Sequence, residues 1–195
     1  MLPIQVLTNN LLYDFSQTTI PTDQVDADWL TKPRQWGIGK ILRFILFIGP
    51  ISSIFDYTTF AMMSFVFKCT DAVAKAQVTP ELIAQFKEEA INHTHAAQLF
   101  QTGWFVESLI TQTLIIHVIR TNLIPFIQSR ASWQLTMTTI LIMLIGAILP
   151  YSPLAGPLGF VPLPWQFWPI LLTTLLCYVG LTQIIKTWLV RKSWI

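Results

Sequence analysis

Residues 41–67, ILRFILFIGPISSIFDYTTFAMMSFVF, form an apolar stretch long enough to cross a membrane as one helix. A membrane span needs about 20 predominantly apolar residues, because each residue of a helix advances only about 1.5 Å. Across the whole chain 53% of the residues are hydrophobic and 11% are charged, whereas soluble domains have about 25% charged residues. The sequence therefore predicts an integral membrane protein with an all-α fold.

Similar runs elsewhere in the chain predict a bundle of five transmembrane helices. Three further clear runs cover residues 99–119, 133–150 and 165–190, and a weaker run covers residues 2–20. The weaker run contains several polar residues, and a central Asp costs about 2.5 to 3.5 kcal/mol on insertion scales. We therefore expect residues 2–20 to insert poorly alone and to form the second half of a helical hairpin.

The positions of Lys and Arg predict the orientation, because cytoplasmic loops carry an excess of these residues. They gather in the loops and at the end that we expect in the cytosol: Lys32, Arg34, Lys40, Arg43, Arg120, Arg130, Lys186, Arg191 and Lys192. The connection 151–164 is uncharged, and the connection 68–98 mixes both signs. We expect these two connections outside, with a short amphipathic helix over 78–95 in the outer loop 68–98. The C-terminus is then cytosolic.

Three acidic residues lie inside apolar stretches: Asp14, Asp56 and Glu107. Charged residues are costly inside a membrane and typically mark ion or proton pathways. Asp14 follows Asn10 by one helical turn, so a carboxylate and an amide carbonyl share one face, about 16 Å deep in the membrane. Mg²⁺ and Ca²⁺ prefer such oxygen ligands. The sequence predicts a metal site at Asn10 and Asp14, which Glu107 from another helix completes.

Structural interpretations of these acids remain open. Asp14 could hydrogen-bond a neighbouring helix, although that role gives little reason for an acid in place of an amide. Asp56 precedes the run from Tyr57 to Thr59, which supplies local hydrogen-bond partners. For Asp56, a packing or gating role is therefore at least as good an interpretation as ion binding.

Several strings of the sequence resemble the C-terminal membrane region of bacterial magnesium-transporting P-type ATPases. They are NLLYDFSQ, KPRQWGIGKILRFILFIGPISSIFDYTTF, FQTGWFVESLITQTLIIHVIRT, IPFIQSRASW and LTQIIKTWLVRK, and they run in order over nearly the whole chain. The resemblance implies one domain over residues 1–195, with spans equivalent to helices six to ten of a ten-helix pump. It also implies the bacterial inner membrane as the location, with the lipid bilayer and the remaining N-terminal part of the pump as partners.

The resemblance extends to the predicted metal site. In related P-type cation pumps an Asn and an Asp four residues apart on the sixth helix ligate the ion, and Asn10 and Asp14 match that spacing. An acid on the eighth helix contributes in calcium pumps, and Glu107 is its equivalent here. The resemblance implies Mg²⁺ as the transported ion, bound by Asp14 in one state of the pump and released in another.

The phosphorylated Asp of this family lies in a DKTGT motif, and neither that motif nor a Gly-rich phosphate loop occurs in the sequence. We therefore expect that this chain alone does not hydrolyse ATP, which acts only through domains outside it. Two alternatives remain: a free-standing accessory or regulatory membrane protein without catalysis, and a pump for Ca²⁺ or H⁺. A passive channel is disfavoured because the hydrophobic spans indicate no water-filled path. Nothing indicates a nucleic-acid partner.

Overall fold

The computed structural model describes residues 1–24, 26, 37–69, 87–121, 123–125 and 127–192, and no β-strand occurs among them. The long helices are α1 (Pro3–Gln17), α3 (Ile38–Ala61), α6 (Lys87–Ile119), α7 (Trp133–Ile148) and α9 (Phe167–Arg191). The short elements are η1 (Ile20–Thr22), the π-helical turn η2 (Met62–Val66), η3 (Leu149–Tyr151) and α8 (Ala155–Leu158). The predicted all-α fold is confirmed.

Within this described part, four helical segments are long and apolar enough to cross a membrane. They are Ile38–Val66, Thr94–Ile119, Trp133–Tyr151 and Phe167–Arg191, close to the four clear runs of the sequence. The weaker run over residues 2–20 corresponds to α1, which has 15 residues and is not among the four. A fifth membrane crossing by α1 therefore stays a prediction.

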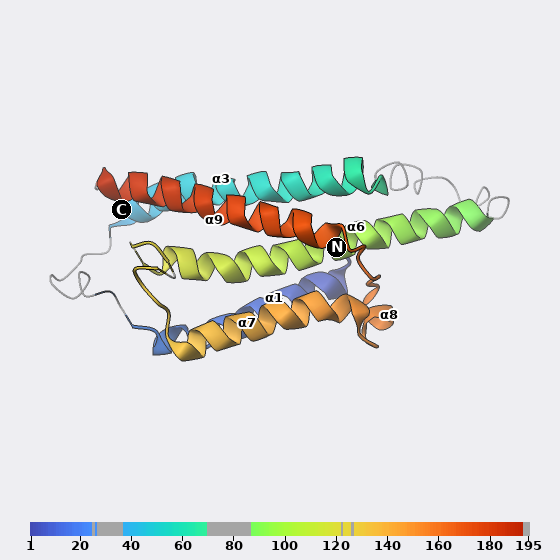
Figure 1. The fold of residues 1–195 in the computed structure, drawn as a ribbon, viewed down its shortest axis with the longest axis horizontal. Helices are drawn as coiled ribbons and strands as arrows, with labels where there is room; N and C mark the ends of the chain where they lie inside the picture. The colour runs from blue at the N-terminus through green and yellow to red at the C-terminus, as the bar shows by residue number, and fades with distance from the viewer. Residues whose placement is uncertain (25, 27–36, 70–86, 122, 126, 193–195) are drawn as a thin grey trace.

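The start of α6 differs from the expected outer loop 68–98. Residues 87–98 are not a separate element but the first part of α6, which has 33 residues. Figure 1 shows the N-terminal turns of α6 extending past the ends of the neighbouring helices. Extending an existing helix costs less free energy than nucleating a second one, which accounts for the single long helix. The rest of the expected amphipathic helix, residues 78–86, lies outside the described residues.

The central element of the bundle is α6. Figure 1 shows α3 and α9 along one side of α6 and α1 and α7 along the other, and α6 contacts all four helices. In the most apolar stretch of α6, 72% of the residues are buried inside the protein. In the corresponding stretches of α3 and α9, 17% of the residues are buried. Polar side chains on α6 are therefore enclosed by protein, whereas the outer helices present apolar surface.

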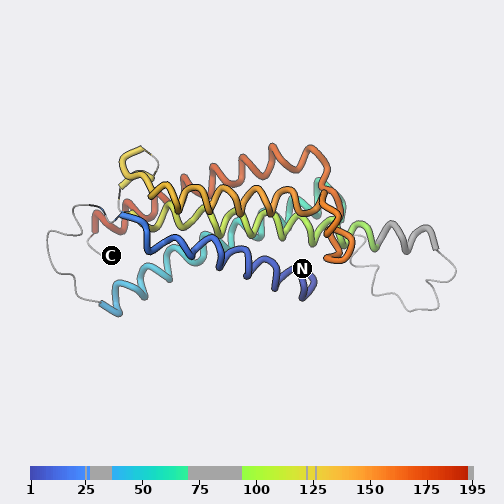
Figure 2. Tube along the Cα trace, turned by 90° about the horizontal axis from the view of Figure 1, so that it is seen from below, coloured from blue at the N-terminus to red at the C-terminus, as the bar shows by residue number. Residues whose placement is uncertain are grey.

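Successive long helices run in alternating directions along the bundle, as Figure 2 shows. As a result α1 runs parallel to α6, and contacts at two levels fix their register. Asn9 Nδ2 lies 3.5 Å from Ser108 Oγ, and Asp23 Oδ2 lies 2.7 Å from Arg120 Nη1. These two contacts determine the position of each α1 residue along the axis of α6.

Carboxylates that follow α1 tie this segment to the end of α6 and the start of α7. Asp23 accepts hydrogen bonds from Arg120 Nη1 and from the Ser132 backbone N–H, both at 2.7 Å. Asp26 accepts one from the Ser129 hydroxyl group at 2.7 Å, and Arg120 Nη2 donates to the same hydroxyl oxygen at 3.0 Å. Since one guanidinium group bridges two segments, the network holds α1 in place against α6.

At the same end of the bundle, Lys186 of α9 closes the C-terminus of α6. Its side chain is 2% exposed, and Nζ donates to the carbonyl oxygens of Val118, Thr121 and Leu123 at 2.8, 3.0 and 3.2 Å. The last carbonyl groups of a helix lack partners within the helix, and a cation is favoured at that negative end. Lys186 therefore caps the C-terminal end of α6.

Close backbone approach joins α6 to α7 at Gly146. A Cβ atom placed on Gly146 would lie 2.3 Å from Leu109 Cδ2, and the Leu109 side chain is 0% exposed. Small residues allow membrane helices to approach closely where lipid supplies no hydrophobic driving force. Gly146 is thus the position at which the α6–α7 contact tolerates least additional volume.

We expect Gly146→Ala to lower the free energy of unfolding by roughly 1–3 kcal/mol, the usual cost of overpacking, because Leu109 must move. Gly180→Ala is the matched control, since nothing lies within 4 Å of a Cβ atom at that position. Thermal unfolding of the purified protein in detergent measures both. Equal unfolding midpoints for the two variants would contradict the close approach of α6 and α7.

We expect Lys186→Met to cost roughly 1–3 kcal/mol of unfolding free energy, because buried carbonyl groups lose their donor. The control is Lys40→Met, which removes an exposed ammonium group of α3 and should change stability by less than about 0.5 kcal/mol. The unfolding midpoints in detergent should differ accordingly. If both variants unfold together, the cap on α6 contributes nothing to stability.

Candidate functional site

The two polar residues predicted as ligands on α1 lie on its exposed side. Asn10 and Asp14 are both exposed, whereas Gln5, Asn9 and Ser16 are buried. Residues four apart share one face of a helix, so Asn10 and Asp14 remain together as the sequence predicted. This pair lies on the side of α1 that α6 and α7 do not cover.

The buried polar residues of α1 have structural partners. Asn9 is 4% exposed, and its amide group donates to the Ser108 hydroxyl oxygen at 3.5 Å. Gln5 is 0% exposed, and its Nε2 donates to the backbone oxygens of Leu158 and Gly159, both at 3.1 Å. Polar content alone therefore does not identify a ligand on this helix. The polar residues of one face pack against the protein, and those of the other face are exposed.

The third predicted ligand, Glu107, lies in a different environment. Its side chain is 1% exposed, and the side chains of Thr59 and Thr111 interact with its carboxyl group. One carboxylate oxygen, Oε2, is buried without a hydrogen-bond partner. Because Thr59 belongs to α3, Glu107 faces α3, and the structure does not bring it to Asn10 and Asp14.

Asp56 on α3 faces the same interface from the other helix. The Trp104 side chain of α6 donates a hydrogen bond to the Asp56 carboxylate. One turn further along α3, Phe60 packs edge-on against Trp104, with 4.8 Å between the ring centroids. The packing interpretation of Asp56 therefore has a specific basis in its contact with Trp104, and Asp56 also interacts electrostatically with Glu107.

Sequence reasoning missed the contribution of α9 to this region. Tyr178 is 3% exposed, hydrogen-bonds with Ser52 and interacts electrostatically with Glu107 and Asp56. Its ring also packs edge-on against Phe55, with 5.2 Å between the centroids. The available signal was a tyrosine near the middle of the run 165–190, where a hydroxyl group needs a partner inside the protein.

The chemistry of these residues suits oxygen-preferring cations. Within the described part of the chain, no group of three or more His, Cys, Asp or Glu side chains could hold a metal. Mg²⁺ does not require such a group, because it keeps several waters and takes one or two carboxylates. Asn10, Asp14 and Glu107 supply suitable oxygens, but Asn10 and Asp14 need further ligands from outside this bundle.

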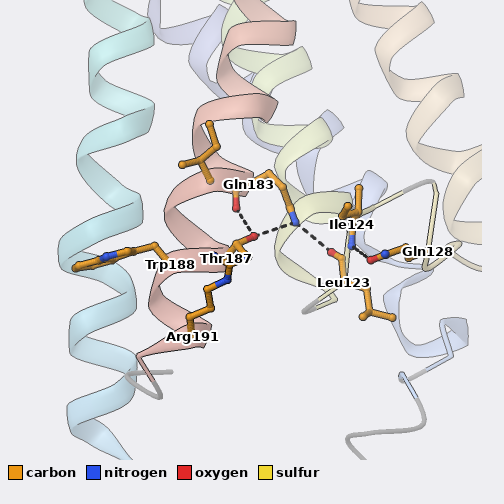
Figure 3. Close-up of a pocket in the computed structure, with 8 residues that line it drawn as sticks. Leu123, Ile124, Gln128, Gln183, Thr187, Trp188 and Arg191 are labelled. Carbon is orange, nitrogen blue, oxygen red and sulfur yellow. Dashed lines mark hydrogen bonds between the residues drawn. The ribbon is translucent and has the colours of Figure 1, made fainter.

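A pocket near one end of α9 has a different character. It has a volume of about 550 Å³. Figure 3 shows it between α9 and the segment after α6, where Gln183 Nε2 donates to the Leu123 carbonyl oxygen at 3.4 Å. Its lining consists of Leu123, Ile124, Gln128, Gln183, Ile184, Thr187, Trp188 and Arg191. Since this lining contains Arg191 and no acid, the pocket does not suit a cation.

Comparison with known proteins agrees with this chemistry. The family model described as Cation transporting ATPase, C-terminus, matches residues 1–188. Magnesium-transporting ATPase, P-type 1, of Salmonella typhimurium strain LT2 is 44% identical over 192 residues, which is 98% of this chain and 19% of the relative. The protein of the same name from Escherichia coli strain K12 gives the same identity and coverage. The chain thus spans 19% of the length of these relatives.

The two faces of α1 generate a paired prediction. Asn9→Ala should lower the free energy of unfolding by about 1 kcal/mol, since the hydrogen bond to Ser108 is lost. Asn10→Ala should change it by less than about 0.5 kcal/mol, because that side chain is exposed. Thermal unfolding of both variants tests this. A larger loss for Asn10→Ala would show that the assignment of faces is reversed.

Proposed function

The chain belongs to the cation-transporting ATPase C-terminal family, and from this premise we propose that it is the C-terminal membrane portion of an ATP-driven Mg²⁺ transporter. The proposal is supported by 44% identity over 98% of the chain to magnesium-transporting P-type ATPases. In this proposal α1 also crosses the membrane, which makes five spans in all, and these spans correspond in order to helices six to ten of the pump. The protein lies in the bacterial inner membrane with its C-terminus in the cytosol.

The observation that carries the proposal for the site is the exposed side of α1. Asn10 and Asp14 lie there among exposed apolar side chains such as Leu11 and Phe15. A carboxylate that faces lipid is costly and therefore needs a partner. We propose that Asn10 and Asp14 bind Mg²⁺ on this side, where other helices of the pump complete the coordination, and that Glu107 serves ion transport from a separate position on α6, facing α3.

The division of labour within the chain follows from its packing. The buried helix α6 and its neighbours provide a rigid frame, and the network of Asp23 and Arg120 holds α1 against it. The ligands on α1 thus sit at the edge of the frame, where helices outside this chain can move relative to them. Domains outside the chain supply ATP hydrolysis, and their movement makes Asp14 bind the ion in one state and release it in another.

We expect Asp14→Asn in the full-length protein to abolish Mg²⁺ transport and Mg²⁺-dependent ATP turnover, because an amide cannot balance the charge of the ion. Assembly and the unfolding midpoint should not change, since the side chain is exposed. Uptake into proteoliposomes, followed with a Mg²⁺-sensitive dye, measures transport.

The control for this experiment is Thr18→Val, which has similar volume and removes an exposed hydroxyl group just beyond α1. It should transport at the normal rate. Normal transport by Asp14→Asn would contradict the assignment of the site. Repeating the assay with Ca²⁺ in place of Mg²⁺ separates the two divalent ions.

A further inference from the structure

A second set of polar groups lies between α3, α6 and α9, and Tyr13 of α1 interacts electrostatically with its member Tyr178. It comprises Asp56, Glu107 and Tyr178, one from each helix, which interact electrostatically with one another. Glu107 and Tyr178 are 1% and 3% exposed, and Asp56 is half-buried. The set therefore lies within the bundle.

Packing shows that both carboxylates face the same interface. Asp56 and Phe60 are four residues apart on one face of α3, and both contact Trp104 of α6. Glu107 follows Trp104 by three residues, which places it on the same face of α6. Thr59, 2% exposed on α3, reaches the Glu107 carboxyl group directly. The two acids are thus opposed across the α3–α6 contact.

The carboxylates are not hydrogen-bonded to each other. A proton shared between them would require an O–H···O⁻ bond of about 2.5–2.7 Å, whereas Asp56 acts on Glu107 only electrostatically and Glu107 Oε2 is buried without any partner. Asn9 also has an unpartnered oxygen, but exchanging its amide O and N lets the Ser108 hydroxyl group donate to it. Glu107 has no such exchange of atoms, so its Oε2 is satisfied only by a proton on the carboxyl group or by a cation.

The basic side chains with established partners on α6 and α9 are engaged elsewhere. Arg120 pairs with Asp23, and Lys186 donates to the carbonyl oxygen of Val118. From Glu107 to Val118, α6 rises about 16 Å at 1.5 Å per residue. These two cations therefore balance charge at the end of the bundle and do not neutralise the opposed acids.

We propose that Asp56 and Glu107 hold a divalent cation between α3 and α6, separate from the one at Asn10 and Asp14. Two carboxylates balance two positive charges, and carboxylate, hydroxyl and water oxygens are the ligands that Mg²⁺ takes. The hydroxyl groups of Thr59 and Tyr178 lie near the carboxylates and offer further oxygen ligands. The proposal deepens the proposed function and rests on it only for the identity of the transported ion.

Binding of Mn²⁺ to the full-length protein in nanodiscs tests this site. Mn²⁺ shares the oxygen preference of Mg²⁺, and the electron paramagnetic resonance signal of free Mn²⁺ counts the ions that are bound. Asp56→Asn and Glu107→Gln should each remove one bound ion or weaken its affinity at least tenfold. Thr58→Val, on the exposed side of α3, should bind as the unmodified protein does.

An unchanged Mn²⁺ count and affinity in both folded variants would overturn the site and leave the acids with a proton only. Folding is checked by size-exclusion chromatography. Should Asp56→Asn not fold, Asp56→Glu keeps the charge but displaces the carboxylate, and unchanged Mn²⁺ affinity in that variant would overturn the site equally. Asp14→Asn should retain the ion between Asp56 and Glu107, so failure of the α1 site does not affect this outcome.

Discussion

Burial of α6 among four other helices is the constraint on which the rest of the structure depends. In a membrane, polar groups must find partners inside the protein because lipid offers none. Enclosure by α1, α3, α7 and α9 allows α6 to carry Glu107 and Ser108 at mid-helix. The same enclosure lets Lys186 reach the carbonyl groups at its end. A central helix that lay at the lipid surface could hold none of these groups at acceptable cost.

The polar residues of the membrane region divide into two environments with different consequences. Asp56 and Glu107 are opposed within the bundle, so whatever neutralises them must fit between helices of this chain. Asn10 and Asp14 lie on an exposed face of α1, so in the proposed function their partners come from outside this bundle. A chain that spans 19% of its relatives thus has one polar centre enclosed by its own helices and another that lies on an exposed face.

Contacts at one end of α1 determine the position of Asn10 and Asp14. Arg120 joins Asp23 to Ser129, and the register of Asn9 with Ser108 follows along the helices. Because α1 is the shortest of the long helices, with 15 residues, these contacts rather than its own hydrophobicity hold it in position. The depth and direction of the exposed Asn10 and Asp14 therefore depend on the charged network of Asp23 and Arg120 at the end of α1.

Local properties of the sequence determined the all-α membrane class, the four clear spans, the acids within them and the family. Run length, apolar composition and residue spacing decide these, and none requires a neighbouring helix. Tertiary structure alone decided that Asn9 packs while Asn10 is exposed, and that Glu107 faces Asp56. It also decided that residues 87–98 extend α6 and that Lys186 caps it. The reason is physical: a side chain's partner comes from another helix, and neighbouring positions on one helix differ by about 100° in direction.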